Sequence, residues 1–148
     1  MSTIRFDYPS LPVSVNKLYA TVRGRKILSK EGRAWKTDFI ARLGGLDPHV
    51  FAQFVPQPEA MYALDLWFYI DDARLFNLTF GVTKAAKSPF GDLDVSNLTK
   101  LAEDAISELV GIRDRNNFDV LLHKRSAGAL GERLVAVLSP LTSMREGP

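Results

Sequence analysis

The sequence predicts a mixed α/β (α+β) fold in which two main helices pack on a small mixed β-sheet. Residues 61–70, MYALDLWFYI, are rich in aromatic and branched side chains, as is typical of a buried strand. Apolar residues recur at helical spacing between Leu98 and Leu109, which predicts an amphipathic helix. A chain of 148 residues has the usual size of one domain, so we expect residues 1–148 to form a single domain with a frayed tail from Ser139.

The first third of the chain is expected to supply a strand, a loop and a helix. Ile4–Tyr8 alternates apolar and polar residues, which indicates a short strand. Leu11–Asn16 contains a proline, which removes a backbone donor and interrupts regular structure, and a loop with Arg23–Lys26 follows. Ser29 is a suitable N-cap for a helix that should end at Gly44-Gly45. The apolar face of this helix would consist of Ala34, Trp35, Phe39, Ile40 and Leu43.

The rest of the chain is expected to hold a second helix and two further strands. Asp47–Pro58 has three prolines and should be a connection, while Leu75–Val82 could form an extra strand before an exposed basic loop at residues 84–91. Ser96 can cap the second helix and Gly111 can end it. The closing strands are predicted over Phe118–Leu122 and Leu134–Leu138, joined through Ser126–Gly131.

Composition and charge exclude several protein classes. The hydrophobic content of 46% and the charged content of 24% are ordinary globular values, so neither disorder nor a membrane protein is predicted. No apolar run approaches the roughly 20 residues that span a bilayer. The first ten residues lack a signal-peptide pattern, and the sequence has no cysteine. We therefore expect a cytoplasmic protein without membrane contact.

Positive charge is concentrated near the N-terminus, although the whole chain has a formal net charge of only +2. Residues 17–42 contain eight basic and two acidic side chains, which leaves +6. Such a segment is expected for a polyanion partner, although a solvated helix face would give the same pattern. The basic residues are Lys17, Arg23, Arg25, Lys26, Lys30, Arg33, Lys36 and Arg42.

One short segment combines two acids with the start of a helix. Asp92 and Asp94 are one residue apart, and alternate residues of an extended strand point to the same face, so both could converge on one cation. The helix that begins near Asn97 would favour an anion at its N-terminus and would carry Lys100 and Asp104 on one side. Asn97 can also donate to a phosphate or orient a metal ligand. Acids for a metal beside donors for a phosphate predict phosphodiester chemistry.

Magnesium suits such a site because it prefers oxygen ligands, needs few protein groups and keeps several waters. Asp92 and Asp94 would supply two ligands. Asp114 is the nearest candidate for a third, and Asp119 is a weaker one. The metal would activate water, while Lys100 could contact the scissile phosphate or offset charge on the leaving oxygen.

A structural explanation of the same residues stays open. Aspartate is a common helix cap, so Asp92 and Asp94 could simply begin the helix. Lys100 and Asp104 could equally form a surface pair four residues apart, worth roughly 0.3–0.5 kcal/mol. The two histidines share no ligand spacing with each other, so zinc is not predicted.

Two separated blocks of sequence resemble the RusA-type Holliday-junction resolvases, which are small, dimeric, metal-dependent endonucleases of bacteria and their phages. The first block, LPVSVNKLY at residues 11–19 with Gly24-Arg25 and LSKEGRAW at residues 28–35, is similar to the family's N-terminal loop and first helix. The second block, DLD at residues 92–94 with NLTK at 97–100 and DAI at 104–106, is similar to its Asp-x-Asp-Asn-Leu-x-Lys signature and the Asp-Ala-Leu that follows.

The resemblance implies a RusA-like fold and a Mg²⁺-dependent crossover junction endonuclease, with Mn²⁺ able to replace Mg²⁺. It assigns Asp92, Asp94 and Asp114 to the metal and, with Lys100, to catalysis. The protein would act as a homodimer, so that two sites nick symmetric strands of a four-way DNA junction in a bacterial or phage-infected cell. The residues expected to bind DNA are Asn16, Lys17, Arg23, Arg25, Lys26, Lys30 and Asn97.

The sequence departs from the family pattern at two places. Val95-Ser96 is inserted before Asn97, and Arg115 follows Asp114 where the family has a second aspartate. An extended insertion would keep the acids on one face but move them about 6–7 Å relative to the helix, whereas a bulge or an extra turn would absorb it. Three hypotheses follow: a nuclease that resolves junctions in recombination and repair, a non-catalytic junction-binding or DNA-binding protein on the same fold, and a structural domain whose acids cap a helix.

Overall fold

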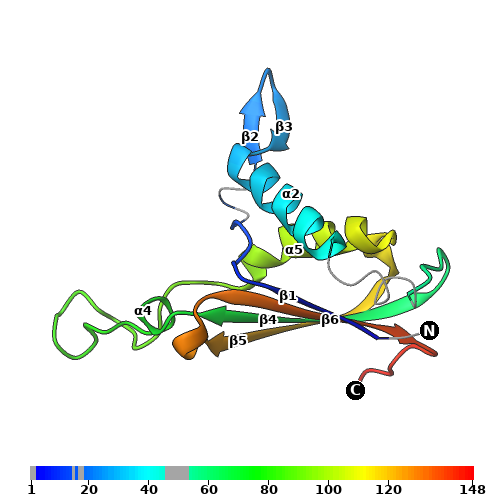
Figure 1. The fold of residues 1–148 in the computed structure, drawn as a ribbon. Helices are drawn as coiled ribbons and strands as arrows, with labels where there is room; N and C mark the ends of the chain where they lie inside the picture. The colour runs from blue at the N-terminus through cyan, green and yellow to red at the C-terminus, as the bar shows by residue number, and fades with distance from the viewer. Residues whose placement is uncertain (1–2, 15, 17–18, 46–53) are drawn as a thin grey trace.

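A computed structural model of the chain describes residues 3–14, 16, 19–45 and 54–148. A four-stranded sheet with the order β1-β6-β4-β5 forms its base (Figure 1). β4 pairs parallel with β5 and antiparallel with β6, and β1 pairs antiparallel with β6. The predicted mixed α/β class with a small mixed sheet is therefore confirmed. The strands are β1 (Ile4–Tyr8), β4 (Met61–Ile70), β5 (Asn117–Ser126) and β6 (Arg133–Leu141).

Strand β4 shows how the sequence builds the sheet. Its even-numbered side chains, from Tyr62 to Ile70, are all 0% exposed and belong to the core. The odd-numbered side chains are only partly buried, apart from Ala63, because alternate residues of a strand point to opposite faces. Helix α5 (Ser96–Val110) covers the core side, and no described helix covers the other face (Figure 1).

Helix α5 buries the apolar stripe that the sequence predicts. Five of its core side chains are at most 2% exposed: Leu98, Leu101, Ala102, Ala105 and Ile106. The helix ends at Gly111, which adopts a left-handed φ of 78° and donates its N–H to the carbonyl of Ser107. The predicted N-cap is wrong, because Ser96 is the first helical residue and Val95 occupies the cap position.

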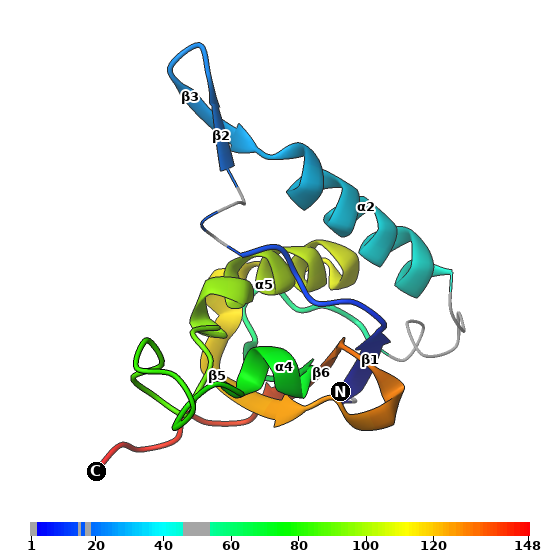
Figure 2. The same cartoon turned by 90° about the vertical axis from the view of Figure 1, so that its left-hand side faces the viewer.

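Helix α2 (Lys30–Gly44) begins and ends as predicted. The Ser29 hydroxyl accepts a hydrogen bond from the Gly32 amide, and Gly45 is the C-cap. The Trp35 and Phe39 rings stack at 5.0 Å, and the Tyr8 ring of β1 packs edge-on against both. Figure 2 shows α2 beside α5, away from most of the sheet.

The segment predicted as a loop around Arg23–Lys26 is a β-hairpin, so that prediction is wrong. Strands β2 (Tyr19–Val22) and β3 (Arg25–Leu28) pair antiparallel around a two-residue turn. Arg23 and Gly24 have φ values of 51° and 75°, the left-handed geometry that matches the twist of hairpin strands. The hairpin projects beyond the first turn of α2 (Figure 1).

The predicted strand over Leu75–Val82 is also wrong. Leu75 ends a short helix, α4 (Asp72–Leu75), and the residues after it form a loop. Backbone hydrogen bonds from Gly91 to Leu75 and from Asn77 to Pro89 close the base of this loop, each 2.8 Å long. The apolar residues of the loop have no sheet to join, and Val82 is 82% exposed. Residues 84 and 87 are exposed lysines, as predicted.

The ends of several other predicted segments differ slightly. β6 continues to Leu141, so the expected tail starts three residues later than Ser139. Much of the predicted connection over Asp47–Pro58 lies outside the described residues, and residues 54–57 have no regular structure. Within the described ranges, no helix has the length and apolarity to cross a bilayer.

Candidate functional site

Asp94 lies two residues before helix α5 begins and contacts its first residue. Its Oδ1 accepts hydrogen bonds from the amide of Ser96 at 2.9 Å and from its hydroxyl at 2.7 Å. These hydrogen bonds, first the one from the hydroxyl and then the one from the amide, hold the pKa of Asp94 below its ordinary value, and the charge of Lys124 adds to the effect. The carboxylate therefore accepts two hydrogen bonds from the first helical residue, although Val95 and not Asp94 occupies the N-cap position.

The two inserted residues are absorbed by the first turn of the helix. The Asn97 amide donates to the Asp94 carbonyl at 3.1 Å, and the Leu98 amide donates to the Val95 carbonyl at 3.0 Å. Val95 and Ser96 thus continue the turn instead of extending the chain. The extra turn, one of the two arrangements considered from the sequence, keeps Asp94 next to the start of the helix.

Lys124 of β5 lies beside this acidic segment. Its ammonium donates a hydrogen bond of 2.5 Å to the carbonyl of Leu93, which separates the two exposed acids Asp92 and Asp94. No sequence pattern predicts a role for Lys124 at this site. Its position depends on the parallel register that pairs Lys124 with Phe68, and no spacing in the sequence reports that register.

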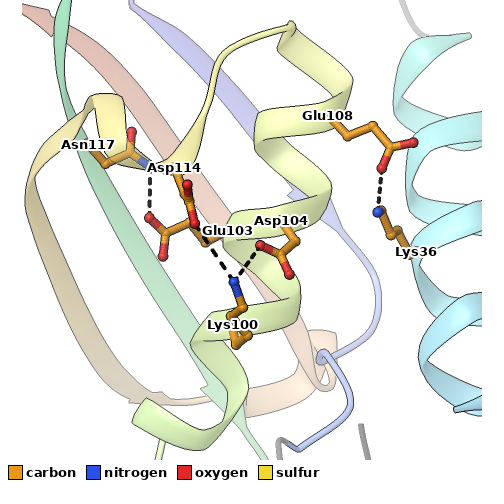
Figure 3. A network of polar contacts seen from close by, with 7 residues as sticks. All are labelled: Lys36, Lys100, Glu103, Asp104, Glu108, Asp114 and Asn117. Atoms are coloured by element: carbon orange, nitrogen blue, oxygen red, sulfur yellow. Dashed lines mark hydrogen bonds and ion pairs between the residues drawn. The ribbon is translucent and has the colours of Figure 1, made fainter. Parts of the chain in front are cut away.

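About one turn into α5, Lys100 lies between two acids (Figure 3). Its ammonium is 3.0 Å from Asp104 Oδ1, the predicted pair four residues apart, and 3.8 Å from Asp114 Oδ2. Asp114 reaches this position because the chain turns back along α5 after Gly111 (Figure 3). The hydrogen bond to Asp104 and the charges of both acids raise the pKa of Lys100, so its ammonium stays protonated.

The same close-up contains two further polar pairs that the sequence analysis did not identify. Glu103 accepts a hydrogen bond of 2.9 Å from the Asn117 side chain, which ties α5 to the first residue of β5 (Figure 3). Lys36 and Glu108 pair across α2 and α5. The first contact links the helix that carries Lys100 to the strand that follows Asp114, and the second links α5 to α2.

The expected magnesium ligands fit the ion in chemistry but are not brought together as a set of three. Among the described residues, no three acidic, histidine or cysteine side chains are gathered closely enough to hold a metal. Asp114 Oδ2 is 3.8 Å from the Lys100 ammonium. The alternative third ligand, Asp119, forms an ion pair in which its Oδ2 is 3.4 Å from Arg145 Nε. Asp92 and Asp94 are both exposed but do not lie on a strand as expected, and Asp94 Oδ1 is already hydrogen-bonded to Ser96. They stay candidates for Mg²⁺ on chemistry alone, since this ion needs only one or two carboxylates.

The residues expected to bind DNA lie on two elements. Arg23, Arg25 and Lys26 are exposed on the hairpin, and Lys30 is exposed at the start of α2. Asn16 is exposed, Asn97 is partly buried in the first turn of α5, and Lys17 lies outside the described residues.

Comparisons with known proteins add no family assignment. No protein-family model matches the chain, and no curated protein sequence matches it.

Proposed function

We propose that the protein is a metal-dependent endodeoxyribonuclease that acts on branched DNA, with the four-way junction as its substrate. The observation that carries the proposal is the 3.8 Å approach of Lys100 to Asp114. The resemblance assigns both residues to catalysis, yet they lie on different elements. Neither a helix cap nor an ion pair within α5 requires Asp114 to be there.

In this proposal, the basic side chains contact phosphates and the acidic side chains hold the metal. The Lys100 ammonium would offset negative charge that develops on the phosphate, and the exposed hairpin arginines would bind backbone phosphates and position the DNA. Asp92 and Asp94 would hold Mg²⁺, or Mn²⁺, which when bound supplies an activated water and neutralises phosphate charge. A cytoplasmic homodimer would present two such sites to the symmetric strands of a junction.

A cleavage assay on a synthetic four-way junction tests this proposal. We expect nicking with Mg²⁺ and none in EDTA, and we expect Asp94→Asn to abolish nicking while junction binding survives. Asp7→Asn is the matched control, because it removes one exposed carboxylate from β1, the far edge strand of the sheet. Strong cleavage in EDTA, or full activity in Asp94→Asn, would contradict the proposed mechanism.

One observation favours a second candidate, a non-catalytic junction-binding protein on the same fold. In the part of the chain that is described, no set of three metal-binding side chains is gathered, and Lys100 is already paired with Asp104. This candidate predicts strongly salt-dependent junction binding without nicking in any divalent metal. The same assay, repeated with Mn²⁺, separates the two candidates.

A further inference from the structure

A pocket of about 260 Å³ lies beside the turn that carries Asp114. Two arginines, Arg113 and Arg115, stand on either side of Asp114 in the sequence and both line the pocket. Its other walls come from the end of α5 and from Pro58, just before β4. The pocket therefore adjoins the Lys100–Asp114 contact without including it.

Several described arginines, Arg113 and Arg115 among them, have no acidic partner, whereas others form ion pairs. Arg5, Arg74 and Arg145 each lie within 4 Å of a carboxylate. Among the described residues, no carboxylate comes that close to Arg113 or Arg115, and both residues are exposed. The acid between them in the sequence is directed to Lys100 instead. Two uncompensated guanidinium groups at one pocket make it a site for an anion.

The turn that presents these arginines is fixed by a buried side chain. Asn116 is only 6% exposed, and its amide donates to the carbonyls of Pro58 and Ala60, both at 2.9 Å. Its side-chain oxygen accepts a hydrogen bond from the Arg113 amide at 3.3 Å. The backbone on both sides of Asp114 is thus held before any ligand arrives, which lowers the entropy that a ligand would have to overcome.

We propose that this pocket is a phosphate subsite that Arg113 and Arg115 form together. Planar guanidinium groups match the oxygens of a phosphate and bind them through paired, charge-assisted hydrogen bonds. The source of the phosphate rests on the proposed function: it is a backbone phosphate of the bound DNA, next to the one that Lys100 contacts. At the position where the resemblance led us to expect a second aspartate, this chain has Arg115, so an anion contact replaces a carboxylate there.

The first test measures junction binding at several salt concentrations in EDTA, where cleavage plays no part. Each phosphate contact adds about 0.9 to the slope of log affinity against log salt. The double variant Arg113→Gln/Arg115→Gln should lower this slope by about one and weaken binding several-fold. A slope unchanged in the double variant overturns the proposal. This test measures binding and not nicking. Its result therefore does not depend on whether the proposed nuclease mechanism is correct.

A matched single variant controls for net charge. Arg115→Gln and Arg5→Gln each remove one positive charge, but Arg5 lies on β1, at the sheet edge opposite β5. Arg115→Gln should weaken binding more than Arg5→Gln does, with the melting temperature of both close to that of the wild type. Equal weakening by the two variants would mean that only net charge matters and would overturn the proposal.

The second test uses inorganic phosphate alone and distinguishes the source of the ligand. In NMR titrations, the arginine side-chain N–H signals of the wild type should shift and saturate with phosphate, and the double variant should lose this response. A response to phosphate together with an unchanged DNA salt slope overturns the assignment to DNA. The absence of a saturable response overturns the subsite itself.

Discussion

Lys100 and Leu101 are neighbours in sequence but meet opposite surroundings on α5. Leu101 is 1% exposed and lies in the core against the sheet. The Lys100 side chain is 46% exposed and lies between Asp104 and Asp114. One face of the helix therefore holds the fold, and the adjacent face carries the charges of the candidate site. Stability and activity should therefore be separable by changing one of two consecutive residues.

Truncation of the buried neighbour should have the largest effect. Leu101→Ala removes buried methyl groups and leaves a cavity, and we expect it to lower the free energy of unfolding by about 2–5 kcal/mol. Urea denaturation followed by circular dichroism measures this. The nicking rate per folded molecule should stay close to that of the wild type. A rate loss far beyond the unfolded fraction would show that the two faces of α5 are not separable.

Substitution of the exposed neighbour, Lys100, should reduce activity and leave stability nearly unchanged. Lys100→Gln removes the charge that would stabilise the transition state, so nicking should slow by about 10²–10³-fold. The free energy of unfolding should change by only about 0.5 kcal/mol, since a half-exposed ion pair contributes little. Single-turnover cleavage and denaturation of the same preparation give both numbers.

Arg5→Gln is the control for this variant, because it removes one positive charge from a paired residue at the far edge of the sheet. Its nicking rate should be close to that of the wild type. If Lys100→Gln also cleaves normally, Lys100 is only a partner of Asp104 and has no role in the cleavage step.

The parts of the fold that the sequence predicts are those that depend on residues close together in the chain. The stripe that contains Leu101, the strand β4 and the ends of α2 were predictable, because they depend on periodicity, composition and capping within consecutive residues. The β2–β3 hairpin was missed because its turn needs two left-handed residues, and Arg23 is an unusual choice for one of them. The exposed loop after Leu75 resembles a strand in composition alone.

The candidate site was predictable only where its contacts are local. The Lys100–Asp104 pair follows from helical spacing, and the structure confirms it. The approach of Asp114 depends on how the chain returns after Gly111, and the position of Lys124 depends on the register of β5 against β4. Both contacts arise from the tertiary arrangement, so no sequence motif predicts them.

The smallest effect concerns Asp94, which lies just before α5, and it depends on pH. The pKa of Asp94 is lowered in the folded protein, first by the hydrogen bond from the Ser96 hydroxyl. The ionised form is therefore favoured by folding, and its contribution to stability is full above the ordinary aspartate pKa, which is about 3.9. The contribution is lost as the pH falls through the lower pKa of the folded state.

Melting temperatures of the wild type and Asp94→Asn, measured from neutral pH down into the acid range, check this direction. The wild type should melt above the variant at neutral pH, and the gap should close as Asp94 becomes protonated. Asp92→Asn is the matched control, because Asp92 is equally an exposed acid of this segment but makes no side-chain hydrogen bond within the described residues. A gap that stays constant with pH would show that the Ser96 contacts do not favour the carboxylate.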